Sequence, residues 1–107
     1  ALLAYCKYDN NVGGTTVKIV DAASGKELQS LAVSRSLLQT MALHPHRKSL
    51  LTCDNTAHVK LWNVQTGEEL RAWQIPGGVN AFAFSSDGKR FASANSNGTV
   101  YVYRFND

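Results

Sequence analysis

The sequence lacks several features that mark particular protein classes. It has no apolar run near the roughly 20 residues of a membrane helix, no secretory signal pattern and no low-complexity tract. Its two cysteines, Cys6 and Cys53, are too few for the disulfide framework of a short secreted chain, so we expect both to be buried thiols. These absences disfavour a membrane protein. They favour an intracellular location over secretion and leave the compartment open.

An excess of charge of one sign is also missing. The formal net charge is +3, from 11 basic and 8 acidic residues, and the lysines are spread along the whole chain. A nucleic-acid footprint would gather them on one face. Single-strand nucleic-acid binding through a basic groove with stacked aromatic residues is therefore the weakest of the functions considered.

A motif recurs along the chain at a nearly constant spacing. The stretch Val17 to Leu28 returns 42 positions later as Val59 to Leu70, and Met41 to Thr52 returns 41 positions later as Phe82 to Ser93. A repeat of this length indicates one supersecondary unit copied in tandem and stabilised by stacking on its neighbours. We therefore expect function to lie on the assembled surface.

The pattern within each unit predicts an all-β fold. Leu37 to Leu43 and Val79 to Phe84 are apolar on nearly every residue, as in strands covered on both faces, and helical periodicity is absent. Ser86-Asp87-Gly88-Lys89 has the composition of a turn, and Asn97-Gly98 is a strong hairpin signal. Four short antiparallel strands in about 41 residues match one propeller blade. The predicted strands span residues 2–6, 17–20, 27–33, 37–43, 50–53, 59–62, 69–75, 79–84, 91–94 and 100–105.

The order of apolar strand, Asp-Gly-Lys turn, small-residue strand, Gly-Thr-Val hairpin, aromatic-rich strand and Thr-Gly-Glu turn resembles the WD-repeat β-propeller family. The best matches are Phe84 to Ser93 and Val59 to Gly67, and the resemblance covers essentially the whole chain. It is a divergent resemblance. The Trp-Asp dipeptide of the family reads Trp62-Asn63, Val20-Asp21 and Tyr103-Arg104 in the three repeats.

Two further departures concern the contacts that hold blades of this family together. The Gly-His pair before the innermost strand is replaced by Ser34-Arg35 and by Pro76-Gly77. The aspartate of the family's hydrogen-bonded tetrad, which joins a histidine, a serine and the tryptophan, falls on Asn55 and Ser96. We therefore expect the tetrad to be absent and the blades to be held by packing and ladder hydrogen bonds.

In blade order, the chain begins at a second strand and ends at a third strand. We predict a partial propeller with about two and a half to three blades of four antiparallel strands: a partial blade at 1–33, a blade at 34–75 and a partial blade at 76–107. Because a ring has roughly 4 to 8 blades, we expect the same polypeptide or other chains to supply the rest. The isolated chain should aggregate or self-associate through its open edges.

The sequence offers little for catalysis, metals or cofactors, and we predict none of them. No serine lies in a nucleophile-elbow context, and the phosphate-cradling Gly-x4-Gly-Lys-Ser/Thr pattern is missing. His44-Pro45-His46 has a spacing that could hold a metal, but it corresponds to an exposed turn in the next repeat and has no third ligand nearby. Gly13-Gly14 lies in a lengthened hairpin, Lys7 to Thr16, which is a plausible place for partner contact.

The leading hypothesis is a non-catalytic scaffold segment that presents propeller loops to protein or peptide partners. The family layout implies that one face carries the loops between second and third strands and the loops that enter the innermost strands. From this face we select candidate residues because aromatic and arginine side chains dominate interfaces and the others offer fixed hydrogen-bonding groups: Tyr8, Arg35, Asp54, Asn80 and Asn95. The alternative is an accessory propeller domain of a larger multidomain enzyme that gates or orients the substrate. A catalytic motif upstream of Ala1 would favour that alternative.

Overall fold

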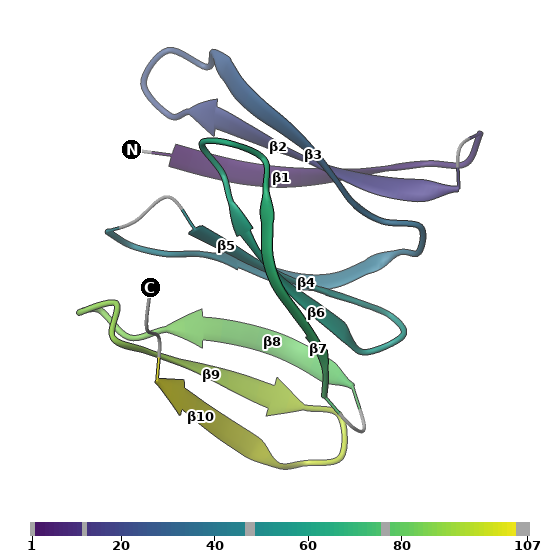
Figure 1. Cartoon of the computed structure of the whole chain (residues 1–107), viewed down its shortest axis with the longest axis vertical. Helices are drawn as coiled ribbons and strands as arrows, with labels where there is room; N and C mark the ends of the chain where they lie inside the picture. Colours follow the sequence, from purple (N-terminus) through teal and green to yellow (C-terminus); the bar gives the residue numbers. More distant parts are fainter. Residues whose placement is uncertain (1, 12, 47–48, 76–77, 105–107) are drawn as a thin grey trace.

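The computed structural model describes residues 2–11, 13–46, 49–75 and 78–104, and within these ranges every regular element is a strand. Figure 1 shows the strands as three separate sheets, one above another in the view. The described residues contain no helix long and apolar enough to cross a bilayer. The strands are β1 (Leu2–Asp9), β2 (Gly14–Asp21), β3 (Glu27–Ser34), β4 (Leu38–Leu43), β5 (Ser49–Asp54), β6 (His58–Asn63), β7 (Glu69–Gln74), β8 (Val79–Phe84), β9 (Arg90–Asn95) and β10 (Val100–Arg104).

All pairings within the three sheets are antiparallel between strands that follow one another in sequence. The sheet orders are β1-β2-β3, β4-β5-β6-β7 and β10-β9-β8. The middle sheet therefore has the four strands expected of a blade, and the outer sheets have three strands each within the described residues. The predicted fold class, all-β with antiparallel propeller blades in a partial ring, is confirmed.

Two hydrophobic clusters hold the sheets together, one on each side of the middle sheet. Strand alternation explains both clusters, because neighbouring residues of one strand point to opposite faces. Leu50 of β5 packs toward the first sheet and Leu51 toward the last one, and both are fully buried. The first cluster contains Val17, Ile19, Leu31, Val33, Leu50, Trp62 and Val64. The second contains Leu51, Cys53, Val59, Leu61, Ile75, Val79, Phe82 and Phe91.

One contact of the tetrad's kind is present in the middle sheet. The indole Nε1 of Trp62 donates a hydrogen bond of 3.0 Å to the hydroxyl of Thr52, and both side chains are buried. The pair is possible because Thr52 lies on β5 and Trp62 on the neighbouring strand β6, with both side chains on the face toward the first sheet. The pair lies within the middle sheet and adds a buried polar contact to its ladder bonds.

The same contact is lost in the last sheet. Ser93 occupies the position of Thr52 and Tyr103 that of Trp62, each 41 residues further on. Tyrosine has no indole N–H, and among the described residues the buried Ser93 hydroxyl has no hydrogen-bond partner. One substitution in the repeat therefore leaves a buried polar group unsatisfied, which costs free energy.

These two hydroxyls give a matched stability prediction. Thr52→Val should lower the free energy of unfolding by about 1–2 kcal/mol, because it leaves the buried indole N–H of Trp62 without an acceptor. Ser93→Ala should change it by less than about 0.5 kcal/mol or raise it, because it removes a group that has no partner. Urea unfolding of the complete protein measures both. Equal losses in the two variants would contradict the assigned contacts.

The first hairpin differs from its prediction. β1 continues to Asp9 rather than ending at Cys6, and Lys7 and Tyr8 pair with Thr16 and Thr15 on β2. The connecting turn is short, because the carboxylate of Asp9 accepts a hydrogen bond from the Asn11 N–H, and its carbonyl accepts one from Gly13. The prediction of a lengthened loop from Lys7 to Thr16 is therefore wrong, and Tyr8 lies in a strand.

Two further expectations about burial need correction. Cys53 is fully buried, as predicted, and burial raises the pKa of its thiol to about 11. Cys6 is exposed, because β1 is an edge strand with neighbours on one side only. Pro76, Gly77 and Phe105, which the sequence placed before an innermost strand and at the end of the last strand, lie outside the described residues.

The turn after β4 is not simply an exposed one. His44 is 5% exposed and its ring packs edge-on against Phe84, with 4.9 Å between ring centroids. Its Nδ1 accepts a hydrogen bond from the His46 N–H, so its Nε2 carries the proton that is donated to the Gly88 carbonyl at 2.8 Å. Both turn histidines reach the turn between β8 and β9, since the exposed His46 contacts the Ser86 carbonyl. The turn after β4 and the turn between β8 and β9 therefore join the middle and last sheets.

Candidate functional site

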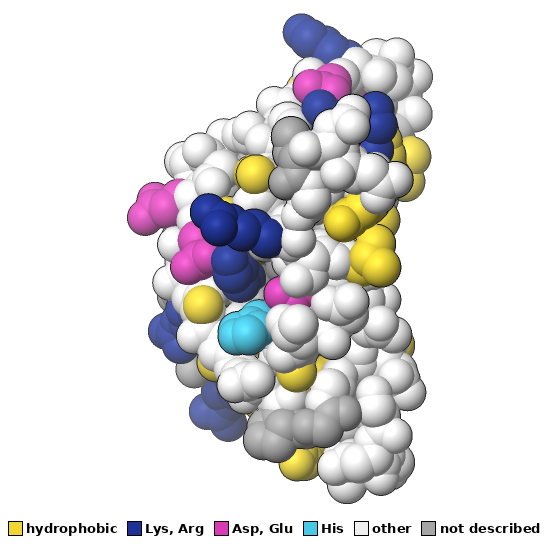
Figure 2. Space-filling model, turned by 90° about the vertical axis from the view of Figure 1, so that its right-hand side faces the viewer, with side chains coloured by type: hydrophobic (Ala, Val, Ile, Leu, Met, Phe, Trp, Pro, Cys, Tyr) yellow, Lys and Arg dark blue, Asp and Glu magenta, His cyan; other side chains and the backbone are white. Residues whose placement is uncertain are grey.

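Alternate turns of an antiparallel sheet lie at alternate ends, so the connections β1–β2, β3–β4, β5–β6, β7–β8 and β9–β10 share one end of the molecule. We call this end the loop face. It lies on the right in Figure 1 and faces the viewer in Figure 2. Figure 2 shows Lys and Arg side chains interspersed with Asp and Glu, and hydrophobic side chains in small groups. The face therefore has no large surface of a single charge.

Two of the predicted residues belong to the first part of the loop face. Tyr8 is 39% exposed at the end of β1, and no hydrogen bond in the described part of the chain links it to the other candidates. Arg35 is exposed in the connection between β3 and β4. Its neighbour Ser34 donates a hydrogen bond of 3.1 Å to Asp54, which ties this connection to the next one along the face.

Asp54 organises the turn between β5 and β6. Its Oδ1 accepts hydrogen bonds from the Thr56 N–H at 2.9 Å, the Thr56 hydroxyl at 2.7 Å and the His58 N–H at 3.1 Å. Its side chain is only 11% exposed. Ala57 in the same turn has φ of 69°, a left-handed conformation that is rare for residues other than glycine. The carboxylate thus supports a strained turn.

Electrostatics keep this carboxylate charged. Burial opposes ionisation, but hydrogen bonds from the Thr56 hydroxyl, the His58 and Thr56 backbone N–H groups and the Ser34 hydroxyl outweigh it. The net effect lowers the pKa of Asp54 below its ordinary value. The imidazole Nδ1 of His58 is 3.8 Å from Oδ1. Asp54 is therefore an anion at neutral pH.

The last two candidates lie at the opposite end of the face from Tyr8. Asn80 is exposed at a bulge of β8, and its Oδ1 accepts a hydrogen bond of 2.9 Å from the Ser96 hydroxyl. Asn95 ends β9 and is only 4% exposed, so the expectation of an accessible loop residue is wrong. Its side-chain amide donates to the Thr99 hydroxyl across the hairpin, which draws it inward. Its Oδ1 has no partner among the described residues.

A polar pocket lies between these groups. Its volume is about 380 Å³, and residues from the middle and last sheets line it. Asp54 forms part of the wall, while Asn80 and Asn95 each adjoin a wall residue along the chain. The lining residues are Gln39, Asp54, Asn55, Thr56, Ala57, Gly78, Val79 and Ser96. Of the five predicted residues, Asp54 alone is among the described wall residues, and Tyr8 and Arg35 lie elsewhere on the loop face.

Sequence reasoning missed Gln39 as a wall residue because it was assigned to an apolar strand. It lies at a bulge in β4, between Leu38 and Thr40, where an extra residue changes the direction of side chains. Gln39 is 41 positions before Asn80, which occupies the corresponding bulge in β8. Applying the repeat to Asn80 would have identified Gln39.

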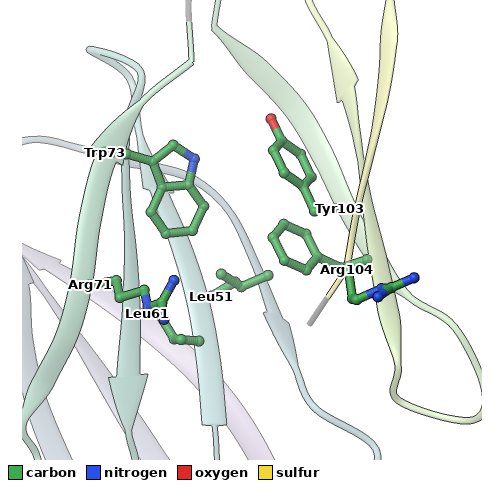
Figure 3. A pocket seen from close by; sticks show the side chains of 7 residues that line it. Leu51, Leu61, Arg71, Trp73, Tyr103 and Arg104 are labelled. Carbon is green, nitrogen blue, oxygen red and sulfur yellow. The ribbon is translucent and has the colours of Figure 1, made fainter. Parts of the chain in front are cut away.

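A second hollow has a different character. It has a volume of about 230 Å³ and lies between the middle sheet and the last one, beside the edge strand β10. Figure 3 shows Trp73 and Tyr103 on opposite sides of this groove and Arg71 beside Leu61. Its lining residues are Leu51, Leu61, Arg71, Trp73, Phe91, Tyr103 and Arg104. The mostly apolar wall suits packing against further protein.

Within the described residues, no group of three or more His, Cys, Asp and Glu side chains is arranged to hold a metal ion. Both ring nitrogens of His44 are engaged in hydrogen bonds. The polar pocket contains one carboxylate and several amide and hydroxyl groups. Chemically, this arrangement can bind a polar or charged group.

Comparison with known proteins adds a second line of observation. Residues 67–104 match the family described as "WD domain, G-beta repeat". The chain is 33% identical over 92 residues to eukaryotic translation initiation factor 3 subunit I of Aspergillus fumigatus, covering 79% of this chain and 26% of that protein. It is 29% identical over 105 residues to target of rapamycin complex subunit wat1 of Schizosaccharomyces pombe, covering 95% of this chain and 32% of that protein. The chain thus spans 26% and 32% of the length of these two relatives.

Proposed function

Because this chain belongs to the WD-repeat β-propeller family, we propose that it is a non-catalytic segment of a scaffold whose loop face binds protein or peptide partners. The polar pocket between neighbouring blades carries this proposal, since a concave site with converging polar groups is a typical binding site. The two relatives are named as subunits, one of eukaryotic translation initiation factor 3 and one of target of rapamycin complex. These names support a role for this chain, too, within a protein assembly.

We assign different roles to the five candidate residues. Tyr8, Arg35 and Asn80 have exposed side chains and contact the partner directly. Asp54 contributes its charge at the pocket wall, and Asn95 orients the adjacent turn through its bond to Thr99. Aromatic and arginine side chains contribute most of the binding energy in many interfaces, so Tyr8 and Arg35 are the main contacts in this proposal.

We further propose that the open edges receive the remaining blades, from the same polypeptide or from other chains. The exposed valines of β10, Val100 and Val102, and the groove beside Trp73 support this assignment, since they leave apolar surface for another sheet to cover. In this arrangement residues 34–75 form one blade, and 1–33 and 76–107 are parts of two others.

The test uses the complete protein with its natural partners. In quantitative co-purification, the amount of partner recovered with a Tyr8→Ala and Arg35→Glu double variant should fall at least about tenfold. The reason is that hot-spot residues each contribute about 2 kcal/mol or more. The melting temperature of this variant should stay close to that of the unmodified protein, since both side chains are exposed. Lys26→Glu, in the exposed turn between β2 and β3 at the opposite end, is the matched control. Retention of every partner by the double variant would refute the proposed function.

A further inference from the structure

We propose that the polar pocket of the loop face binds a cationic side chain, Lys or Arg, of an extended partner segment, with Asp54 as the opposing charge. This inference rests on the proposed function and adds the chemistry of the partner. It follows from the charge, the walls and the position of the pocket.

Within the described residues, the charge of Asp54 has no permanent counter-charge. No Lys or Arg in the described part of the chain forms an ion pair with it, and His58, 3.8 Å away, is charged only when protonated. Its hydrogen bonds come from neutral hydroxyl and backbone groups. These bonds offset the burial of the carboxylate but leave its negative charge without an opposite charge, so an ion pair remains to be gained. A cation from a partner would supply that ion pair.

The polar groups on the pocket wall can bind the peptide backbone on either side of an inserted Lys or Arg side chain. Among the described residues that line it, Asp54 alone is ionisable, so no fixed cation of this set competes for the carboxylate. The side-chain amides of Gln39 and Asn55 form no hydrogen bond within the described residues, and each amide offers both donors and an acceptor. They can therefore bind the peptide groups on either side of the inserted side chain. A volume of about 380 Å³ lies within the usual range of ligand pockets.

A metal ion is a poorer occupant. Calcium takes six to eight oxygen ligands, among which carboxylates are prominent, and magnesium takes six in a nearly ideal octahedron. Asp54 is the only carboxylate among the wall residues that the structure describes, and three hydrogen bonds already occupy its Oδ1. A Lys or Arg side chain needs only the remaining accessible side of this group.

The position of the pocket keeps it accessible in a complete ring. It lies between the connections β5–β6, β7–β8 and β9–β10, where the middle and last sheets already adjoin. The sheet edges that the proposed function assigns to further strands are β1 and β10, and neither contributes a residue to the described wall of the pocket. Additional blades packed against those edges leave the pocket open on the loop face.

The experiment measures binding of three synthetic pentapeptides to the complete protein by saturation-transfer NMR. The peptides are identical apart from a central Arg, Lys or Gln. We expect the Arg and Lys peptides to bind and the Gln peptide to bind at least tenfold more weakly. Added salt should lower the affinity of the Arg and Lys peptides more than that of the Gln peptide, because salt screens the charge pair with Asp54. Equal binding of the Gln peptide would overturn the inference.

Two variants and a control locate the binding. Asp54→Asn removes the charge and should reduce binding of the Arg peptide at least tenfold. Ser96→Lys introduces a tethered cation at the pocket wall from an exposed position and should cause a similar loss. Asp21→Asn makes the same charge change at the last residue of β2, at the opposite end of the molecule, and should alter binding less than twofold. If Asp54→Asn fails to fold, Ser96→Lys decides the question.

This inference and the proposed function can fail separately. If Ser96→Lys and a folded Asp54→Asn variant retain the Arg peptide while the Tyr8 and Arg35 double variant loses its natural partners, the pocket chemistry is wrong and the scaffold function stands. If the double variant keeps all partners, the proposed function is wrong, and with it the basis of this inference.

Discussion

Trp62→Ala lowers the free energy of unfolding of the complete protein by about 3–5 kcal/mol, as expected for a buried large-to-small substitution. The side chain is 7% exposed and packs between the first and middle sheets with Val17, Leu31 and Leu50. Its removal opens a cavity there and also leaves the buried Thr52 hydroxyl without its donor. Urea unfolding measures the change.

Two controls separate packing from the polar contact. Trp62→Phe keeps most of the ring volume and removes the indole N–H, so its loss should be clearly smaller than that of the alanine variant. His46→Ala affects an exposed turn residue with one hydrogen bond and should lose less than about 1 kcal/mol. An unchanged unfolding midpoint for Trp62→Ala would show that the assigned strand register is wrong.

Gly88→Ala should destabilise the protein by about 2–4 kcal/mol through two separate effects. Gly88 has φ of +72°, a conformation that alanine adopts at a cost of roughly 1–2 kcal/mol. An added Cβ would also approach the imidazole Nε2 of His44 to 2.6 Å. Because His44 is buried and donates to the Gly88 carbonyl, its ring cannot move without losing this contact between the sheets.

Gly25→Ala is the matched control for this variant. Gly25 has nearly the same φ, +73°, and an added Cβ there meets no atom within 4 Å. Its substitution should therefore cost only the backbone term, roughly 1–2 kcal/mol. The difference between the two variants in urea unfolding reports the contact between the turns of the middle and last sheets. Equal losses would contradict the assigned role of His44.

The strand pattern could be predicted from the sequence because it depends on local and periodic signals. The repeat of 41 to 42 residues aligned Val59 to Trp62 with Val100 to Tyr103, and both stretches are third strands of their sheets. The first hairpin was predicted less well. Its residues Lys7, Tyr8, Thr15 and Thr16 have the polar character of a loop, and their pairing became evident only in the register with β2.

The burial of individual residues depends on neighbouring repeats, which the sequence did not place in space. His44 appeared to lie in a solvated turn, yet the turn that covers it is 44 residues away at Gly88. The Trp62–Thr52 hydrogen bond was not predicted for a related reason, since it depends on the pairing of two strands, with its residues ten positions apart, and not on the replaced tetrad aspartate. Such contacts follow from how blades pack, and composition alone does not encode them.

In the candidate site, too, the sequence predicted positions along the chain but not the surroundings of each side chain. Asp54 and Asn95 were selected at equivalent positions of two repeats, but one is an ionised carboxylate at a pocket wall and the other is a buried amide. Three separate connections assemble the pocket, so its shape could not be read from any one of them. Gln39 could have been predicted from the sequence, because it occupies the same position of the repeat as Asn80.

The most direct test of the central claim, that the loop face is the partner-binding surface, is hydrogen–deuterium exchange of the complete protein with and without a co-purified partner. The account predicts slower exchange on binding in residues 35–37, 55–57 and 96–99, and unchanged exchange in the opposite turns at 22–26, 64–68 and 85–89. Protection confined to the opposite turns, with the loop-face connections unaffected, would contradict it.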